Sequence, residues 1–231
     1  MKGSVVELVV DRICQELSLP RVRVAAAVAL LNEGNTVPFI ARYRKEATGS
    51  LDEVAIRAIE DRVAYYKELL ERRETVLKSI AKQDKLTPEL KARIENAWSK
   101  TDLEDLYLPY KPKKRTKATD AKERGLEPLL EALLADESGA DPLMLASPFV
   151  KAEAEGLQTP SACLEGAGHI LAERLAEDAD LRAWLRQEFH DTGTLQSTLR
   201  EEKKEGQEAL RFKSYWDFKE PLKKMPGHRV L

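Results

Sequence analysis

Apolar residues recur along most of the chain three and four positions apart, the period of an amphipathic α-helix. Over the first thirty-odd residues this spacing predicts two helices, one ending near Pro20 and one over residues 21–33, with Gly34 just after its last turn. Two short helices joined by a tight turn resemble half of a helix-turn-helix bundle. We therefore expect the chain to begin with a helix-turn-helix-like pair.

Residues 36–46 interrupt this pattern and are expected to form an ordered connector. The segment places Arg42, Arg44 and Lys45 around a tyrosine and beside a short apolar anchor. Two interpretations stay open at this point, because basic surface loops are common. The cations are either solvated on a packed loop or in contact with a ligand.

A long helix is predicted to start at Ser50, whose hydroxyl and the carboxylate of Glu53 have the spacing of a capping box. Arg73 interrupts its otherwise heptad-like stripe. The helix is expected to reach about Gln83, a length of roughly 50 Å at 1.5 Å per residue, and to form the spine of the domain. The apolar stripe consists of Ile56, Ile59, Val63, Tyr66, Leu70, Leu77 and Ile80.

After this spine comes Thr87, a residue type preferred at a helix N-cap, and then Pro88, which is preferred in the first turn. Another amphipathic helix is therefore predicted from here to Trp98. Residues 101–104 repeat the capping-box pattern before a short apolar turn that Pro109 stops. The following residues 110–117 are basic and interrupted by proline. We expect them to form an exposed loop.

Helical spacing resumes over residues 121–136 and from 160 to about 190, with a stretch rich in proline and glycine between them. These patterns predict an all-α fold, a multi-helix domain over residues 1–137 and a second helical region over residues 138–231. An apolar run has just begun at residues 228–231, so we expect the chain to be cut there and not naturally finished.

Composition agrees with a folded helical protein: of 231 residues, 42% are hydrophobic and 34% are charged. No apolar run approaches the roughly 20 residues that span a bilayer, and no signal peptide is recognisable, so a cytoplasmic location is expected. The net charge of −2 hides an asymmetry. Residues 109–124 hold seven basic and two acidic side chains, whereas residues 136–191 hold four basic and twelve acidic ones. One face is thus suited to an anionic partner.

The usual signatures of hydrolases, nucleotide-binding loops and zinc sites are missing from the sequence, so no enzymatic activity, cofactor or metal is expected. His169, His190 and His228 are widely separated, and the two cysteines do not suggest a disulfide or a metal site. Gly166 and Gly168 only superficially begin a dinucleotide fingerprint. Small residues there are predicted to serve close helix packing.

Several segments together resemble the Tex family of bacterial transcription accessory proteins. The resemblance implies the N-terminal helical part of a nucleic-acid-binding transcription factor, followed in full-length members by RNase-H-like, helix-hairpin-helix and OB-type RNA-binding domains that this chain lacks. Gly168 and His169 depart from the family, which commonly has Arg-Asp there. The matching segments are TVPFIARYRKE at 36–46, GSLD at 49–52, LEDLYLPYKPKKRTKA at 103–118, GLEPL at 125–129, ILAE at 170–173 and PGHRVL at 226–231.

Two functions remain open. The first is phosphate contact with RNA or DNA, to which lysine, arginine and a stacking tyrosine are suited. The second is a protein-interaction scaffold that contacts RNA polymerase or associated factors without binding nucleic acid, which the long helix with its interrupted stripe and the acidic second half suggest. For the basic loop itself, the alternative to phosphate contact is that its charges keep the loop extended and pair with acidic helices of the same protein. The candidate nucleic-acid-binding residues are Arg42, Arg44, Lys45, Tyr110, Lys111, Lys113, Lys114, Arg115 and Lys117.

Overall fold

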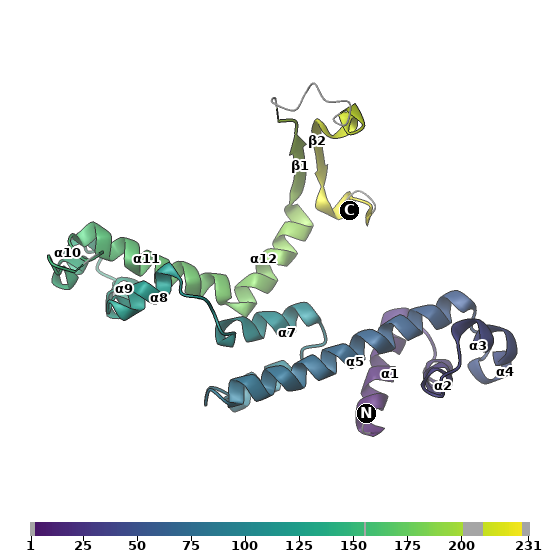
Figure 1. Cartoon of the computed structure of the whole chain (residues 1–231). Helices are drawn as coiled ribbons and strands as arrows, with labels where there is room; N and C mark the ends of the chain where they lie inside the picture. The colour runs from purple at the N-terminus through teal and green to yellow at the C-terminus, as the bar shows by residue number, and fades with distance from the viewer. Residues whose placement is uncertain (1–2, 155, 201–209, 228–231) are drawn as a thin grey trace. The chain divides into compact units, whose positions relative to one another are not determined.

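A computed structural model describes residues 3–154, 156–200 and 210–227, so the apolar run at 228–231 lies outside the described residues. The chain divides into two compact units, Met1–Tyr107 and Leu108–Leu231. Within the described residues the secondary structure is predominantly helical, with one two-stranded sheet (Figure 1). The predicted helical fold class is confirmed, whereas the sheet was not predicted.

The first unit is entirely helical in its described part. Its helices are α1 (Gly3–Leu17), α2 (Arg21–Asn32), α3 (Val37–Tyr43), α4 (Lys45–Thr48), α5 (Glu53–Ala81), α6 (Pro88–Glu95) and α7 (Lys100–Tyr107). The predicted opening pair is confirmed as α1 and α2. Gly34 follows α2 with a φ of +87°, the left-handed backbone that glycine adopts without strain.

Helix α5 is the spine of the first unit, as predicted. Helices α1, α2 and α3 contact it, and so do α6 and α7, with α1–α4 gathered toward its N-terminal end (Figure 1). Its buried side chains follow the predicted stripe, with Leu69 and Val76 in place of their neighbours Leu70 and Leu77. The predicted Val63, Leu70 and Leu77 are half-buried. Burial, and then a hydrogen bond to Glu16 of α1, raises the pKa of Tyr66 to about 12.

Arg73, which interrupts the apolar stripe, faces the interior of the first unit. Its guanidinium lies 5.0 Å from the ring centre of Trp98 and donates to the carbonyl of Ala97. Arg12 of α1 also lies beside Trp98, 4.9 Å from the ring centre. Burial lowers the pKa of Arg73. Arg73 can therefore occupy a position in the apolar stripe because its guanidinium forms a cation–π interaction with the indole ring of Trp98.

Helix starts were predicted correctly in one of three cases. The Thr87 hydroxyl accepts from the N–H of Leu90 at 3.2 Å, as expected. The spine is capped by Asp52, which accepts from the N–H of Ala55 at 2.8 Å, because Ser50 has a φ of +65° and lies too early in the turn. In a polar run several side chains can cap, and the local backbone selects one.

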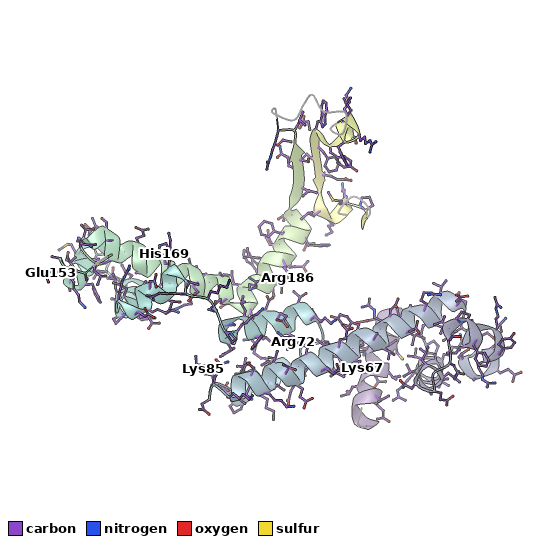
Figure 2. The ribbon with its side chains drawn as sticks, viewed as in Figure 1. Lys67, Arg72, Lys85, Glu153, His169 and Arg186 are labelled. Carbon is purple, nitrogen blue, oxygen red and sulfur yellow. The ribbon has the colours of Figure 1, made fainter. Side chains whose placement is uncertain are left out.

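The third helix starts two residues earlier than predicted, with Ser99 in place of Thr101 as its cap. The Ser99 hydroxyl accepts from the N–H groups of Thr101 and Asp102, at 3.1 and 3.3 Å, and α7 begins at Lys100. Glu104 instead receives a two-pronged contact from Arg72 of α5, with N···O distances of 2.5 and 3.0 Å; Figure 2 labels Arg72. The carboxylate therefore joins two helices.

The predicted connector at residues 36–46 is wrong, because α3 and α4 occupy most of it. Thr36 is extended, and Pro38 lies in the first turn of α3, where its missing N–H costs nothing. Val37 and Ile40, three positions apart, are both buried, and α3 packs on α5. Tertiary burial thus stabilises a helix of two turns that the sequence pattern alone did not indicate.

The second unit combines helices with a hairpin. Its elements are α8 (Lys117–Glu123), α9 (Glu127–Ala135), α10 (Pro142–Ala146), α11 (Pro160–Glu177), α12 (Ala179–Thr192), β1 (Thr194–Thr198) and β2 (Asp217–Pro221), with short 3₁₀ turns at Leu108–Tyr110, Ser147–Phe149, Lys213–Tyr215 and Leu222–Lys224. Each predicted helical stretch is split in two. Gly125, at a φ of +82°, separates α8 from α9, and Asp178 caps α12 directly after α11.

The core of the second unit takes side chains from α8, α9, α10 and α11, and therefore from both sides of residue 137. The domain boundary at residues 137 and 138 stays a prediction.

Close packing at Gly166 is confirmed, because a Cβ there would lie 2.3 Å from the Leu126 side chain. Ala167 is buried, whereas Gly168 meets nothing within 4 Å.

The two strands pair antiparallel, with Thr194 opposite Pro221 and Thr198 opposite Asp217. Most residues of β1 are exposed, so its sequence lacks the apolar alternation by which a strand is recognised. None of the described helices combines the length and apolar character needed to cross a membrane.

Candidate nucleic-acid interface

The candidate residues fall into two groups, one in each unit. The first group lies where α3 ends at Tyr43 and α4 begins at Lys45. Arg42, Tyr43, Arg44 and Lys45 are all exposed, and they line an open hollow of about 500 Å³ together with Glu46 and Ala47. We call these four residues and Phe39 the α3–α4 patch. The break between two short helices thus concentrates three cations at one turn.

Aromatic rings lie among these cations. The rings of Phe39 and Tyr43 are one helical turn apart, with centres 5.3 Å from each other. The Arg44 guanidinium lies 5.4 Å from the centre of the Phe39 ring. Tyr43 remains 67% exposed, so most of its surface is accessible to a further planar group.

The cations of the α3–α4 patch are not neutralised by any residue that the structure describes. In the described residues Arg42, Arg44 and Lys45 form no ion pair, although five other pairs involve residues of α5. Their positive charge is therefore available to an external anion.

The second group is the basic loop, residues 110–117. The prediction of an exposed loop is confirmed for residues 111–115, while Lys117 is already the first residue of α8. Thr116 caps that helix by accepting from the N–H of Thr119 at 3.1 Å. Tyr110 is half-buried at the end of a 3₁₀ turn, so its ring is less accessible than that of Tyr43.

Two cations of the basic loop are paired with carboxylates of the second unit. Lys113 contacts Glu177 and lies 3.8 Å from Glu173, both on α11. Arg115 donates to Asp120 and, at 2.9 Å, to Glu123. The hydrogen bond to Asp120 raises the pKa of Arg115.

The remaining loop cations are free of such contacts. Lys111, Lys114 and Lys117 form no ion pair within the described part of the chain. The structure therefore divides the basic loop into neutralised and available charges, which sequence reasoning treated as one cluster.

Glu173 organises this pairing and was missed by the sequence analysis. Its side chain is 14% exposed and accepts from Lys122 and from the Thr116 hydroxyl, each at 3.0 Å. Burial raises the pKa of Glu173, but the hydrogen bonds and the charge of Lys113 outweigh burial and hold the pKa below its ordinary value. The spacing of Glu173 and Glu177 on one helix face is the signal that could have indicated this acceptor.

Metal and thiol chemistry receive no support from the described residues. They contain no group of three or more histidine, cysteine, aspartate or glutamate side chains that could hold a metal ion. Burial raises the pKa of both Cys14 and Cys163, which disfavours the reactive thiolate.

Two family models match the chain. Residues 7–81 match the Tex-like protein N-terminal domain, and residues 137–231 match a region described as Tex central region-like. The first match contains the α3–α4 patch, and the basic loop lies between the two matches.

Relatives with known names agree with these matches. The chain is 49% identical to Protein tex of Bordetella pertussis, over 96% of this chain and 28% of that protein. It is 47% identical to Transcriptional accessory protein Tex of Neisseria gonorrhoeae, over 94% of this chain and 28% of that protein. A human protein, S1 RNA-binding domain-containing protein 1, is 32% identical over 70% of this chain and 16% of its own length. The chain spans less than a third of the length of these relatives, and it belongs to the Tex family of transcription accessory proteins.

Proposed function

We propose that this chain contributes phosphate contacts to a larger nucleic-acid-binding transcription accessory protein, and that the α3–α4 patch makes them. The observation that carries this proposal is the set of three exposed cations without an ion-pair partner in the described residues. Cations of this kind bind phosphates and release counterions to solvent. The names of the Neisseria and human relatives support the same class of function.

The free lysines of the basic loop are a second source of contacts. Lys111, Lys114 and Lys117 can reach phosphates without breaking an ion pair of the described residues. Lys113 and Arg115 would first have to leave their carboxylates, which reduces the net gain from a phosphate contact. We therefore rank the α3–α4 patch above the basic loop.

Fluorescence anisotropy with labelled single-stranded RNA and duplex DNA at two salt concentrations tests the proposal. The variant R42E/R44E/K45E should bind roughly tenfold to a hundredfold more weakly than the unchanged chain, with a salt slope smaller by about 2 for single strands. The matched control K67E/K82E/K85E reverses three exposed, unpaired lysines of the same unit, of which Figure 2 labels Lys67 and Lys85. Equal binding by both variants would contradict the proposal.

A second candidate function is protein contact without nucleic acid. Helix α12 exposes Trp184 and Phe189, which are 58% and 61% exposed, together with Leu185. Large apolar side chains gathered on one helix are typical of protein interfaces. Residues 136–191 hold twelve acidic and four basic side chains, so a basic protein surface would suit them.

We propose RNA polymerase or a factor bound to it as the partner in that case. A binding assay with purified RNA polymerase should then detect the unchanged chain and lose the variant W184S/F189S. Unchanged binding by that variant would exclude α12 as the contact.

A further inference from the structure

A groove in the second unit, between α8 and α11, has features of a ligand site, and of the residues in the proposed function only Lys117 lines it. It encloses about 260 Å³. Each helix contributes residues at positions i, i+3, i+4 and i+7, beginning at Lys117 on α8 and at Ala162 on α11. Such positions share one helix face, so the groove is lined by the facing surfaces of two packed helices. Figure 1 shows α8 beside α11, and Figure 2 labels His169 on the latter.

Small residues let the two backbones come close and leave the groove open. Ala121 of α8 and Ala162 and Gly166 of α11 are among the lining residues. A Cβ on Gly166 would lie 2.3 Å from the end of the Leu126 side chain, so glycine permits a close contact there. The charged side chains of the lining are longer than these three and can extend over them.

Gly156 holds one of those charged groups in place. Its φ is +76°, and the Arg124 guanidinium packs so closely on it that a Cβ would lie 2.2 Å from Nη1. The backbone conformation therefore favours glycine, and a Cβ there would displace the end of the Arg124 side chain. The Arg124 guanidinium thus lies against Gly156, which also lines the groove.

The groove is lined by two cations, Lys117 and Arg124, and two carboxylates, Asp120 and Glu165. Asp120 is already bound by Arg115, and the Glu165 carboxylate lies 3.5 Å from Nε2 of His169. Lys117 and Arg124 line the same groove and form no ion pair in the described residues. Two cations without an ion-pair partner in the described residues thus line a small cavity, and one of its two carboxylates, Asp120, is paired with Arg115 outside the lining.

We propose that this groove binds a small anion that carries a phosphate or diphosphate group. The cavity is below the roughly 300–1,000 Å³ typical of drug-sized ligands, so it suits a small group. Guanidinium and ammonium groups are the usual protein partners of phosphate. Residues 117 and 124 are about 10 Å apart along the axis of α8, a separation that long side chains can bridge around a diphosphate.

The phosphate group can come from a free small molecule or from the end of a nucleic acid. Inorganic pyrophosphate is the probe for the first source. For the second, an RNA oligonucleotide with a 5′-phosphate is compared with the same oligonucleotide lacking it. Because the α3–α4 patch lies in the other unit, the variant R42E/R44E/K45E should bind pyrophosphate like the unchanged chain.

Isothermal titration calorimetry of the full 231-residue chain with pyrophosphate tests this proposal. We expect saturable binding at one site, and a loss of about tenfold or more in K117A/R124A. The control K151A/K219A removes two exposed lysines of the same unit that form no ion pair in the described residues. It should bind like the unchanged chain.

A second variant separates binding from folding. R124K keeps the charge but loses the planar fork, so it should bind more weakly than the unchanged chain and more tightly than R124A. Circular dichroism melting of each variant identifies any that unfold. Absence of saturable binding by the unchanged chain, or equal affinity in folded K117A/R124A, would overturn the proposal.

Discussion

The α3–α4 patch and the basic loop look alike in sequence and differ in structure. Each concentrates cations beside a tyrosine within a few residues. In the patch all three cations are unpaired within the described residues, and Tyr43 is exposed. In the loop Lys113 and Arg115 bind carboxylates, and Tyr110 is half-buried.

The difference shows that the density of charge along a sequence is not the charge available for binding. The partners of Lys113 lie about sixty residues away on α11, where folding places them. An ion pair within the chain must break before its cation can bind phosphate, so it reduces the affinity gained. The loop cations that pair therefore serve the stability of the second unit, while the patch cations remain free.

Reversal of Lys113 should have the largest effect on stability. K113E places a third carboxylate beside Glu173 and Glu177, which are 14% and 18% exposed at their side chains. We expect a loss of about 2 kcal/mol in the free energy of unfolding, measured by urea denaturation. The control K114E, which changes an unpaired lysine of the same loop, should lose less than about 0.5 kcal/mol. Equal losses would show that the Lys113 pairs contribute no stability.

Removal of the two tyrosine rings should sharpen the comparison of binding. Y43A should weaken binding of single-stranded RNA about fivefold to tenfold, because base stacking on an aromatic ring contributes roughly 1–3 kcal/mol per base. Y110A should change the affinity less than twofold among molecules that stay folded. Anisotropy titrations of both variants make the test, and a larger loss in Y110A would reverse the ranking of the two sites.

Neutralisation of Glu173 should have the smallest effect and should depend on pH. The pKa of Glu173 is lower in the folded chain than its ordinary value, so its stabilising contribution is complete above the unfolded pKa and is lost as pH falls through the folded pKa. E173Q should cost about 1 kcal/mol at neutral pH and should lose less stability than the unchanged chain on acidification. Thermal melting between pH 7 and pH 3 measures both, and parallel curves would contradict this role.

Most helices could be predicted because they are stabilised by burying apolar side chains that recur three and four positions apart in the sequence. The stripe of α5 and the Thr87 cap are local patterns: the cap was identified correctly, and so were four of the six buried residues of the stripe. Helix α3 was missed because burial of Val37 and Ile40 against α5 stabilises it, and that burial depends on residues distant in sequence. The hairpin was missed because β1 is mostly exposed.

The candidate site was predictable in residue type but not in partners. The sequence indicated which cations gather at residues 42–45 and 110–117. Two interpretations of these cations remained open from the sequence, contact with phosphate or pairing with acidic helices. No local pattern decides between them. The structure supports pairing for Lys113 and Arg115, because Glu173, Glu177, Asp120 and Glu123 lie against them.

The most direct test compares two variants that each remove three positive charges. R42Q/R44Q/K45Q neutralises the α3–α4 patch, and K113Q/K114Q/R115Q neutralises the centre of the basic loop. Both are titrated with labelled single-stranded RNA by fluorescence anisotropy at low salt, after circular dichroism has established that they are folded. We predict that the patch variant loses roughly tenfold or more in affinity and the loop variant less than about threefold. A greater loss in the loop variant would contradict the claim that unpaired cations, and not local charge density, determine where this chain binds nucleic acid.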